Sequence, residues 1–271
     1  MVHGLGGSAL NWMAVGPGLA ESYHPLAIDL AGFGRTPLFR RTATVGANTK
    51  LVHDFIARVA GRPAMLMGNS MGGHIAILEA AAHPESVTSM VLVNPAIPGP
   101  HVRRPEPRML GAMAALSVPG LAQMFIDRRV RSLGPEGLVE RALELVCADA
   151  SRIDPVSVEA HVQLTREREH LGPQNARAFI QATRSIALHM ADPRFWSRVA
   201  AVKAPTLILH GSVDRLIPVA AARELHRRRP DWELEVFEGI GHVPMLETPD
   251  LFLDALTSWT ATKIPSAAAA S

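Results

Sequence analysis

A glycine-rich hexapeptide places one serine where it could act as a nucleophile. Residues 68–73 read GNSMGG and fit the pattern G-x-S-x-G, with Ser70 at the centre. A nucleophile on a sharp turn between a strand and a helix adopts strained dihedral angles, and small neighbours avoid clashes there. The alternative is a glycine-rich helix entry that only packs. Because an apolar run precedes Ser70 and a helix-compatible segment follows it, we predict a nucleophile.

A base and an acid follow later in the chain. A serine hydroxyl is a poor nucleophile until a base takes its proton and a third group fixes the tautomer of that base. Asp214 stands just past a predicted strand, and His242 stands in a loop after the last predicted strand. The chain order is therefore serine, aspartate, histidine. We predict that Ser70 attacks a carbonyl carbon, that His242 moves the proton, and that Asp214 orients and stabilises the imidazolium.

Two backbone amides are candidates for binding the oxyanion that such an attack creates. The N–H of Met71 lies at the start of a predicted helix, where the helix dipole also favours negative charge. The second donor is expected from the glycine-rich loop 3–8 (HGLGGS), with the N–H of Leu5 in that role. No residue pattern identifies the substrate-binding side chains.

The elements that must hold these residues alternate between short apolar runs and longer helix-compatible segments. The alternation predicts an α/β fold with a mostly parallel, doubly wound sheet covered on both faces. We assign residues 1–98 and 199–264 to this core, 99–198 to a helical insertion, and 265–271 to a disordered tail. The predicted strands are 24–29, 64–68, 89–94, 205–211 and 233–237, and the predicted core helices are 8–22, 45–60, 71–83, 219–229 and 249–262.

Composition excludes several other classes of protein. The chain has 271 residues, of which 48% are hydrophobic and 19% charged, with a net charge of +2, so a globule is expected and a nucleic-acid binder is not. Residues 109–126 carry no charge, but Pro119 divides them into two pieces too short for a membrane span. One cysteine, Cys147, excludes an internal disulfide. We expect a cytoplasmic protein that acts on a small molecule without a cofactor or metal. The sequence does not decide whether the protein forms a homodimer.

Five segments, in this order along the chain, resemble the successive signatures of the α/β-hydrolase fold superfamily. They are HGLGGS (3–8), DLAGFGRT (29–36), GNSMGG (68–73), HGSVDRLIP (210–218) and GHVPMLETP (241–249). The resemblance covers nearly the whole chain. It implies that fold, the same three catalytic residues, the same two amide donors, and a cap domain over 99–198 that shapes the substrate pocket.

Two branches of that superfamily are disfavoured by single residues. Some members place the acid after the strand that here ends at Asn94, and an amide cannot serve as that carboxylate. Haloalkane dehalogenases and epoxide hydrolases use an aspartate nucleophile, which Ser70 argues against.

Within the serine branch, GNSMGGH resembles the meta-cleavage-product hydrolases, which cleave a C–C bond in ring-opened dienoates. Those enzymes commonly carry tryptophan directly after the catalytic histidine, whereas this chain has Val243. Their substrate carboxylate also needs a cap arginine, for which Arg177 and Arg184 are candidates that no motif separates. We rank hydrolysis of a small apolar carboxylic ester first, C–C hydrolysis second, and non-catalytic ligand binding on the same scaffold as a third alternative.

The position of the glycine-rich loop in the chain indicates an incomplete sheet. In the superfamily that loop normally follows three strands, and here it begins at residue 3. Residues 1–3 resemble only the end of the third strand, which lies in the middle of the family's sheet. We therefore expect the N-terminal strands to be missing, with further residues upstream of Met1 in the natural protein and lower stability and activity without them.

Other residues of reactive type have simpler interpretations. His3 is expected to order the glycine-rich loop, and His74 to pack or face solvent, although it lies one helical turn after the nucleophile. Asp29 is expected to stabilise a turn, and Cys147 to be a buried thiol. The remaining histidines, including His53, show no metal-ligand spacing.

Overall fold

A four-stranded parallel sheet forms the centre of the molecule. The computed structural model describes residues 1–98 and 121–263. The strands are β1 (Ala64–Asn69), β2 (Val87–Val93), β3 (Thr206–Gly211) and β4 (Glu233–Phe237), and neighbours in the sheet follow the order β1-β2-β3-β4. Four of the five predicted strands are thus confirmed. The predicted tail over 265–271, and residues 99–120 with Pro119, lie outside the described residues.

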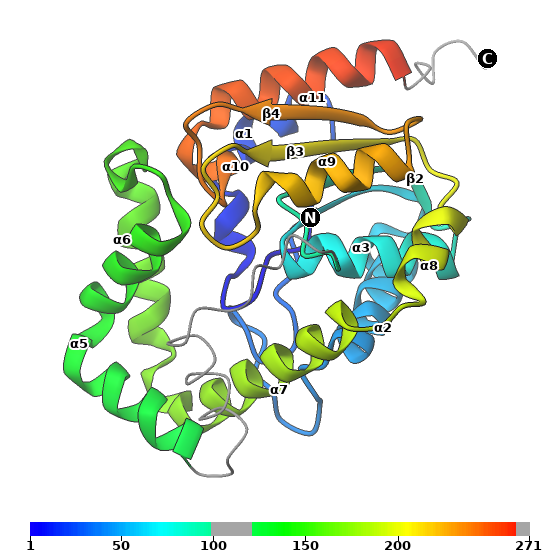
Figure 1. Ribbon diagram of the computed structural model, residues 1–271. Coiled ribbons are helices and arrows are strands. Elements are labelled where there is room, and N and C mark those ends of the chain that lie inside the picture. Colours follow the sequence, from blue (N-terminus) through cyan, green and yellow to red (C-terminus); the bar gives the residue numbers. More distant parts are fainter. Residues whose placement is uncertain (99–120, 264–271) are drawn as a thin grey trace.

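Helices cover both faces of this sheet, as the apolar strands require. Figure 1 shows α11 along one face of β3 and β4, with α9 along the other. The helical elements of the core are η1 (Ala9–Trp12), α1 (Gly16–Ala20), α2 (Val45–Phe55), the π-helical turn η2 (Ile56–Ala60), α3 (Met71–Ala82), α8 (Phe195–Ala201), α9 (Val219–Arg228), α10 (Pro244–Glu247) and α11 (Pro249–Lys263).

Alternate strand residues enter two separate hydrophobic clusters. Leu92 and Ile208 pack on the face that α3 and α9 cover, with Trp232 at its edge. Val91 and Leu209 point to the other face. There they meet the buried residues Trp12, Leu19, Phe252 and Trp259 from η1, α1 and α11. Both faces of the described sheet are therefore covered, and its strands are mostly apolar, with the partly exposed Glu233 and Glu235 in β4.

The prediction of a strand over residues 24–29 is wrong. Within this segment only Ile28 makes a β-bridge, and its partner is Val2. Val2 bridges Gly68 of β1 on its other side, and its N–H donates to Met67 O at 2.8 Å. Residues 24–29 are mostly apolar, as predicted, but of the described residues between this segment and β1 only Val2 forms β-bridges. A single bridged residue cannot build the ladder of hydrogen bonds that defines a strand.

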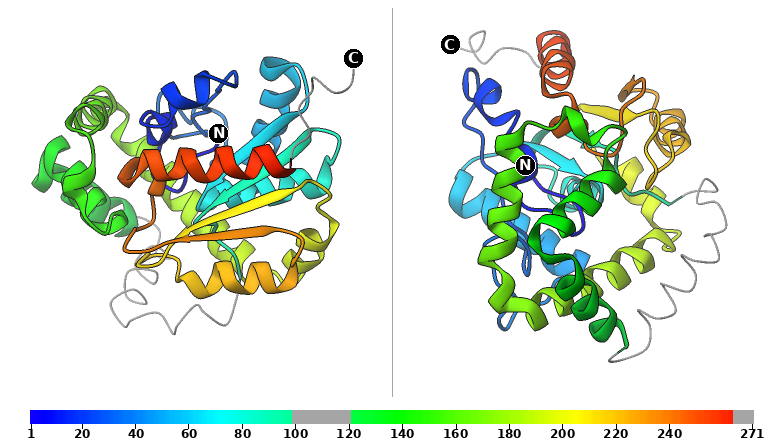
Figure 2. Two further views of the ribbon diagram at one scale, coloured as in Figure 1. Left: turned by 90° about the horizontal axis from the view of Figure 1, so that it is seen from above. Right: turned by 90° about the vertical axis from the view of Figure 1, so that its left-hand side faces the viewer.

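In the segment predicted as a cap, every secondary-structure element that the structure describes is helical, with a kink at Gly134 in the first of them. The segment contains α5 (Leu121–Val146), η3 (Ala150–Arg152), α6 (Pro155–Glu167), η4 (Glu169–Leu171) and α7 (Gly172–Met190). Figures 1 and 2 show α5 and α6 standing away from the sheet, whereas α7 runs back toward α2. Two backbone amides fix α7 to the core, because Ala43 N donates to Gln181 Oε1 at 3.0 Å and Val45 N to Ser185 Oγ at 2.9 Å. The division of the chain into core and cap stays a prediction.

None of the helices in the two described ranges combines the length and apolar character that crossing a bilayer requires.

A neutral histidine is buried within α3. His74 is fully buried, its Nδ1 donates to Ala96 O at 2.8 Å, and its ring stacks on Phe195 with centroids 4.7 Å apart. Burial lowers the pKa of His74 from 6.5 to about 4, the Ala96 carbonyl opposes this, and the charge of Arg198 adds to the lowering. The packing interpretation of His74 therefore agrees with its position.

This histidine is expected to make the protein less stable in mild acid. The unfolded chain binds a proton at His74 near pH 6.5, but the folded chain does so only near pH 4. Because the unfolded state binds more protons between these values, the unfolding free energy should fall by about 3 kcal/mol from pH 7 to pH 4 through this group alone. Urea unfolding at both pH values measures the difference. His74→Gln should reduce it by that amount, and an unchanged difference would contradict the assignment.

Candidate active site

Ser70 occupies a strained turn between β1 and α3. Its φ of 55° and ψ of −117° lie outside the regions that non-glycine residues prefer. Its N–H donates to Val93 O at 2.9 Å, and its carbonyl accepts from Ala96 N at 3.0 Å and His74 N at 3.1 Å. Such backbone strain costs about 1–3 kcal/mol and persists only where the surroundings impose it, which is most often at functional sites.

The glycines of the motif are required by contacts with backbone. A Cβ atom on Gly72 would lie 2.3 Å from Val2 O, and one on Gly68 would lie 2.3 Å from Gly72 O. Rigid main-chain atoms cannot move aside as the end of a flexible side chain can. The turn therefore requires glycine, whose side chain is a hydrogen atom, at both position 68 and position 72, as the motif predicts.

Replacing Gly72 by alanine should lower the unfolding free energy by about 1–3 kcal/mol, the usual cost of forcing a methyl group into filled space. Urea unfolding followed by circular dichroism measures this. Gly46→Ala in α2 is the matched control, because nothing lies within 4 Å of the added Cβ. There the substitution should be neutral or stabilising, since alanine favours helix. Equal stability of the Gly72→Ala variant and the parent would show that the turn tolerates a side chain.

Asp214 and His242 meet in a buried hydrogen bond. His242 Nδ1 lies 2.6 Å from Asp214 Oδ2, and both residues are less than 10% exposed. Asp214 Oδ1 accepts from the N–H groups of Leu216 at 2.7 Å and Ile217 at 3.0 Å. Burial by itself raises the pKa of Asp214, but its hydrogen bonds, with that from His242 the strongest, outweigh burial and hold the pKa below the usual value. The carboxylate is therefore charged and fixes the histidine with its Nδ1 as donor.

Two asparagines that the sequence did not identify as site residues position this pair. Asn94 Nδ2 donates to Asp214 Oδ2 at 2.6 Å and to Gly241 O at 3.3 Å. Asn69 Nδ2 donates to Val93 O at 3.1 Å and to His242 O at 3.0 Å. In the sequence, Asn69 is distinguished only by its position inside the G-x-S-x-G motif. Asn94 is distinguished only because some α/β-hydrolases carry the catalytic acid at the end of that strand.

The structure thus brings the loop of His242 beside the turn that holds Ser70. The side-chain amide of Asn69, the residue before Ser70, donates to the backbone carbonyl of His242, so one side chain links the two segments. Within the described part of the chain the Ser70 hydroxyl makes no hydrogen bond to the imidazole. Catalytic hydrogen bonds often tighten only when substrate binds, so the junction of Ser70 with His242 stays a prediction.

The glycine-rich loop passes directly against Ser70. A Cβ on Gly4 would lie 3.0 Å from Ser70 Cβ, so the backbone before Leu5 runs beside Ser70. His3 is fully buried, its Nδ1 donates to Gly4 O at 2.7 Å, and its Nε2 accepts from Leu30 N at 3.0 Å. Burial lowers the pKa of His3 to about 4, so the ring is neutral and holds the loop.

Met71 is the first residue of α3, where backbone N–H groups have no acceptor within the helix. Leu5 and Met71 therefore lie on the two backbone segments that adjoin Ser70. Their role as oxyanion donors stays a prediction.

A buried glutamate, also missed from the sequence, holds the other side of the His242 loop. Glu247 Oε2 accepts from Gly241 N at 2.9 Å and from Ala148 N at 3.1 Å. His242 N donates to Val146 O at 2.6 Å, at the end of α5. The histidine loop is therefore tied to the end of the predicted cap.

Other candidates take supporting positions. Asp29 Oδ1 accepts from Ala9 N and its Oδ2 from Arg35 N, each at 2.7 Å, so it holds its turn as expected. Burial raises the pKa of the Cys147 thiol to about 12, which leaves no thiolate nucleophile at neutral pH. Arg177 and Arg184 are both exposed on α7.

Comparison with known proteins gives three kinds of match. The family model described as serine aminopeptidase, S33, matches residues 1–249. A curated relative from Cupriavidus pinatubonensis, 2-hydroxy-6-oxononadienedioate/2-hydroxy-6-oxononatrienedioate hydrolase, is 25% identical over 248 residues, covering 89% of this chain and 79% of its own. Another from Burkholderia cepacia, 2-hydroxy-6-oxo-6-phenylhexa-2,4-dienoate hydrolase, is 26% identical, covering 93% and 83%. A solved structure of a putative lipase from Acinetobacter baumannii aligns with a TM-score of 0.75 and 25% identity, covering 96% and 82%.

Proposed function

The chain belongs to the serine aminopeptidase, S33, family of α/β-hydrolases, and we propose that it is a serine hydrolase of small apolar carboxylic esters in which Ser70, His242 and Asp214 form the catalytic triad. The single observation that carries this proposal is the hydrogen bond between His242 and the carboxylate of Asp214, 2.6 Å long and tied by Asn69 to the strained turn of Ser70.

The hydrogen bond to Asp214 determines how His242 would act. With Nδ1 donating to the carboxylate, Nε2 is left as the basic nitrogen. Nε2 takes the proton of Ser70 as Oγ bonds to the ester carbonyl carbon, and the amides of Leu5 and Met71 stabilise the resulting oxyanion. When the C–O bond breaks, His242 returns that proton to the leaving alcohol. Water then attacks the acyl-enzyme with His242 again as base, which releases the acid and frees Ser70.

The ranking of esters above C–C substrates depends on the residue after His242. Val243 is 2% exposed and belongs to the core cluster on the α11 face, so its side chain supplies no substrate surface. The structural match to a putative lipase at 25% identity also favours an ester.

A second candidate function is hydrolysis of a C–C bond in a ring-opened dienoate. The two curated relatives described above are hydrolases of such compounds, which is the specific observation in its favour. The same triad would serve, because both reactions add a nucleophile to a carbonyl carbon and expel a leaving group.

Covalent labelling and a substrate comparison test these proposals together. A fluorophosphonate should label the protein once, and peptide mass spectrometry should place the label on Ser70. Turnover of p-nitrophenyl esters from acetate to octanoate should exceed turnover of a phenyl-substituted dienoate by at least tenfold. The reverse preference would establish C–C hydrolysis instead. Absence of labelling, with no product from either substrate class, would favour the non-catalytic alternative.

A further inference from the structure

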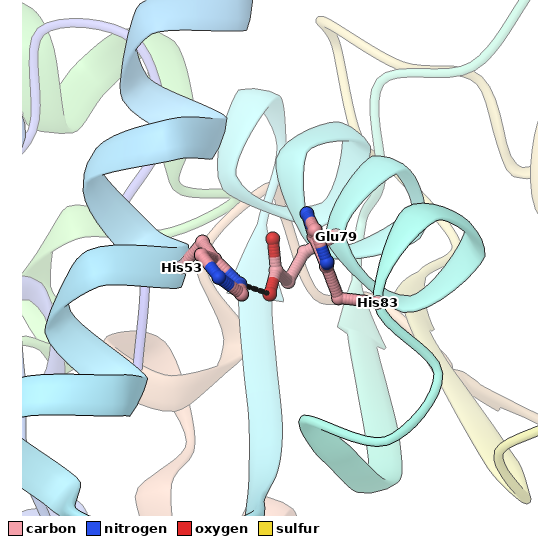
Figure 3. A group of neighbouring side chains, drawn as sticks. All are labelled: His53, Glu79 and His83. Atoms are coloured by element: carbon pink, nitrogen blue, oxygen red, sulfur yellow. Dashed lines mark hydrogen bonds and ion pairs between the residues drawn. The ribbon is translucent and has the colours of Figure 1, made fainter.

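A second group of ionisable side chains lies at the end of α3 opposite to Ser70. His53 comes from α2, Glu79 from the last turns of α3, and His83 directly follows α3. Figure 3 shows the three side chains facing one another between the two helices. One ligand-type atom from each, an imidazole nitrogen or a carboxylate oxygen, lies within 4.8 Å of the other two. Sequence spacing did not pair His53 with His83, because 30 positions separate them and only the packing of α2 on α3 joins them.

The carboxylate of Glu79 is the unusual member of this cluster. Its side chain is fully buried. Oε1 accepts from Ser86 Oγ at 2.8 Å and lies 2.9 Å from His53 Nδ1. Oε2 is also buried and has no hydrogen-bond partner among the described residues. A buried carboxylate oxygen without a partner is costly, and a cation beside it removes that cost.

We propose that His53, Glu79 and His83 bind a divalent first-row transition cation, with Zn²⁺ as the representative ion. Two imidazoles and one carboxylate are ligands that Zn²⁺ commonly takes, whereas Mg²⁺ and Ca²⁺ prefer oxygen alone. The cation replaces the proton that His53 Nδ1 now shares with Glu79. Water, or the exposed carboxylate of Glu85, whose Oε1 lies 3.6 Å from His83 Nδ1, completes the coordination.

The side chains have the freedom that coordination requires. Bonds of about 2.1 Å bring tetrahedral ligand atoms to about 3.4 Å from one another, so atoms now up to 4.8 Å apart must move closer. The two imidazoles stack with centroids 3.9 Å apart, and one ring must turn for both to face a single ion. The side chain of His83 is 40% exposed and that of His53 is 32% exposed, so both rings border solvent and the site opens to it.

The site would act on structure and not on the chemistry at Ser70. Ser70 precedes α3 and His83 follows its 12 residues, so the helical rise places them about 20 Å apart. A cation here would join the ends of α2 and α3, and the negative end of the α3 dipole adds to its binding. Metal binding should therefore raise thermal stability without changing ester turnover.

Metal titration of the full chain without a histidine tag, after treatment with EDTA, tests the site. Calorimetry with ZnCl2 should give one ion per chain, and the melting temperature should rise by several degrees with Zn²⁺ but not with Mg²⁺. A melting temperature and heat signal that do not respond to Zn²⁺ would overturn the proposal.

Variants locate the bound ion. His83→Asn should weaken Zn²⁺ binding at least tenfold and abolish the shift in melting temperature, while ester turnover without metal stays within twofold of the parent. Glu79→Gln is less decisive because that buried residue can affect folding. His24→Asn, at an exposed position, is the matched control and should bind Zn²⁺ as the parent does. Unchanged affinity and stoichiometry in His83→Asn would mean that the ion binds elsewhere, for example at His242, and that His53 and Glu79 form only an ion pair.

Discussion

Ser70→Ala is expected to lower kcat for p-nitrophenyl acetate by about 10⁵- to 10⁶-fold, the range found when a triad nucleophile is removed. The substitution deletes the one atom that would form the acyl-enzyme. Only the backbone amides and substrate binding would then accelerate attack by water, and these leave a residual of roughly 10³–10⁴ over the uncatalysed rate. Initial rates at pH 8, together with the burst of p-nitrophenol in the first turnover, measure the loss.

Folding should not account for that loss. The Ser70 hydroxyl makes no capping bond to α3, and alanine keeps the Cβ atom that already occupies the strained turn. The variant should therefore melt within about 2 °C of the parent, a shift that corresponds to about 1 kcal/mol for a chain of this size. Ser258→Ala, on the exposed side of α11, serves as the matched control and should retain full turnover. Activity of Ser70→Ala within tenfold of the parent would reject Ser70 as the nucleophile.

The elements that position Ser70 were predictable because each is determined locally. The apolar run of β1 and the two glycines beside Ser70 are contiguous in sequence, and the backbone contacts of Gly72 explain why no larger residue could stand there. The strand at 64–68 was predicted to within one residue of β1. The prediction of a strand over 24–29 was wrong because a strand depends on a partner that is distant in the sequence. Here Val2 is the only described residue that pairs with this segment.

The residues that hold the site together were not predictable from their own neighbourhoods. Asn69, Asn94 and Glu247 act through hydrogen bonds to residues 173, 120 and 99 positions away. The residues next to each of them in the sequence do not reveal this role, not even inside the G-x-S-x-G motif in the case of Asn69. The role appears only when the fold places a carbonyl, carboxylate or N–H group within hydrogen-bond distance of the side chain. The pairing of His53 with His83 is of the same kind, since it arises from the packing of two helices. Sequence motifs identify reactive groups, whereas the supports of those groups depend on tertiary contacts.

Asp214→Asn should lower kcat by about 10⁴-fold, the usual effect of replacing the orienting carboxylate of a serine triad with an amide. The hydrogen bonds of Asp214 explain why an amide cannot substitute. Oδ2 accepts from His242 and Asn94, and Oδ1 accepts from the backbone N–H groups of Leu216 and Ile217. Asparagine offers one oxygen and one NH2 group, so in either orientation its NH2 faces donors. The variant should therefore lose stability as well as activity, which urea unfolding and initial rates measure separately.

Exchanging the two side chains gives this prediction its sharpest control. In the double variant Asn94→Asp with Asp214→Asn, the amide oxygen at 214 can accept from Leu216 and Ile217, while its NH2 donates to the new carboxylate at 94. The conflict with residue 94 disappears, but the NH2 group at 214 still faces Nδ1 of His242. The exchange should therefore restore part of the lost stability, while turnover should stay within tenfold of Asp214→Asn. Asn94→Asp alone places two carboxylates against each other, 2.6 Å apart where an amide now donates, and should be less stable than the parent. Turnover of Asp214→Asn within tenfold of the parent would show that this carboxylate does not orient the catalytic base.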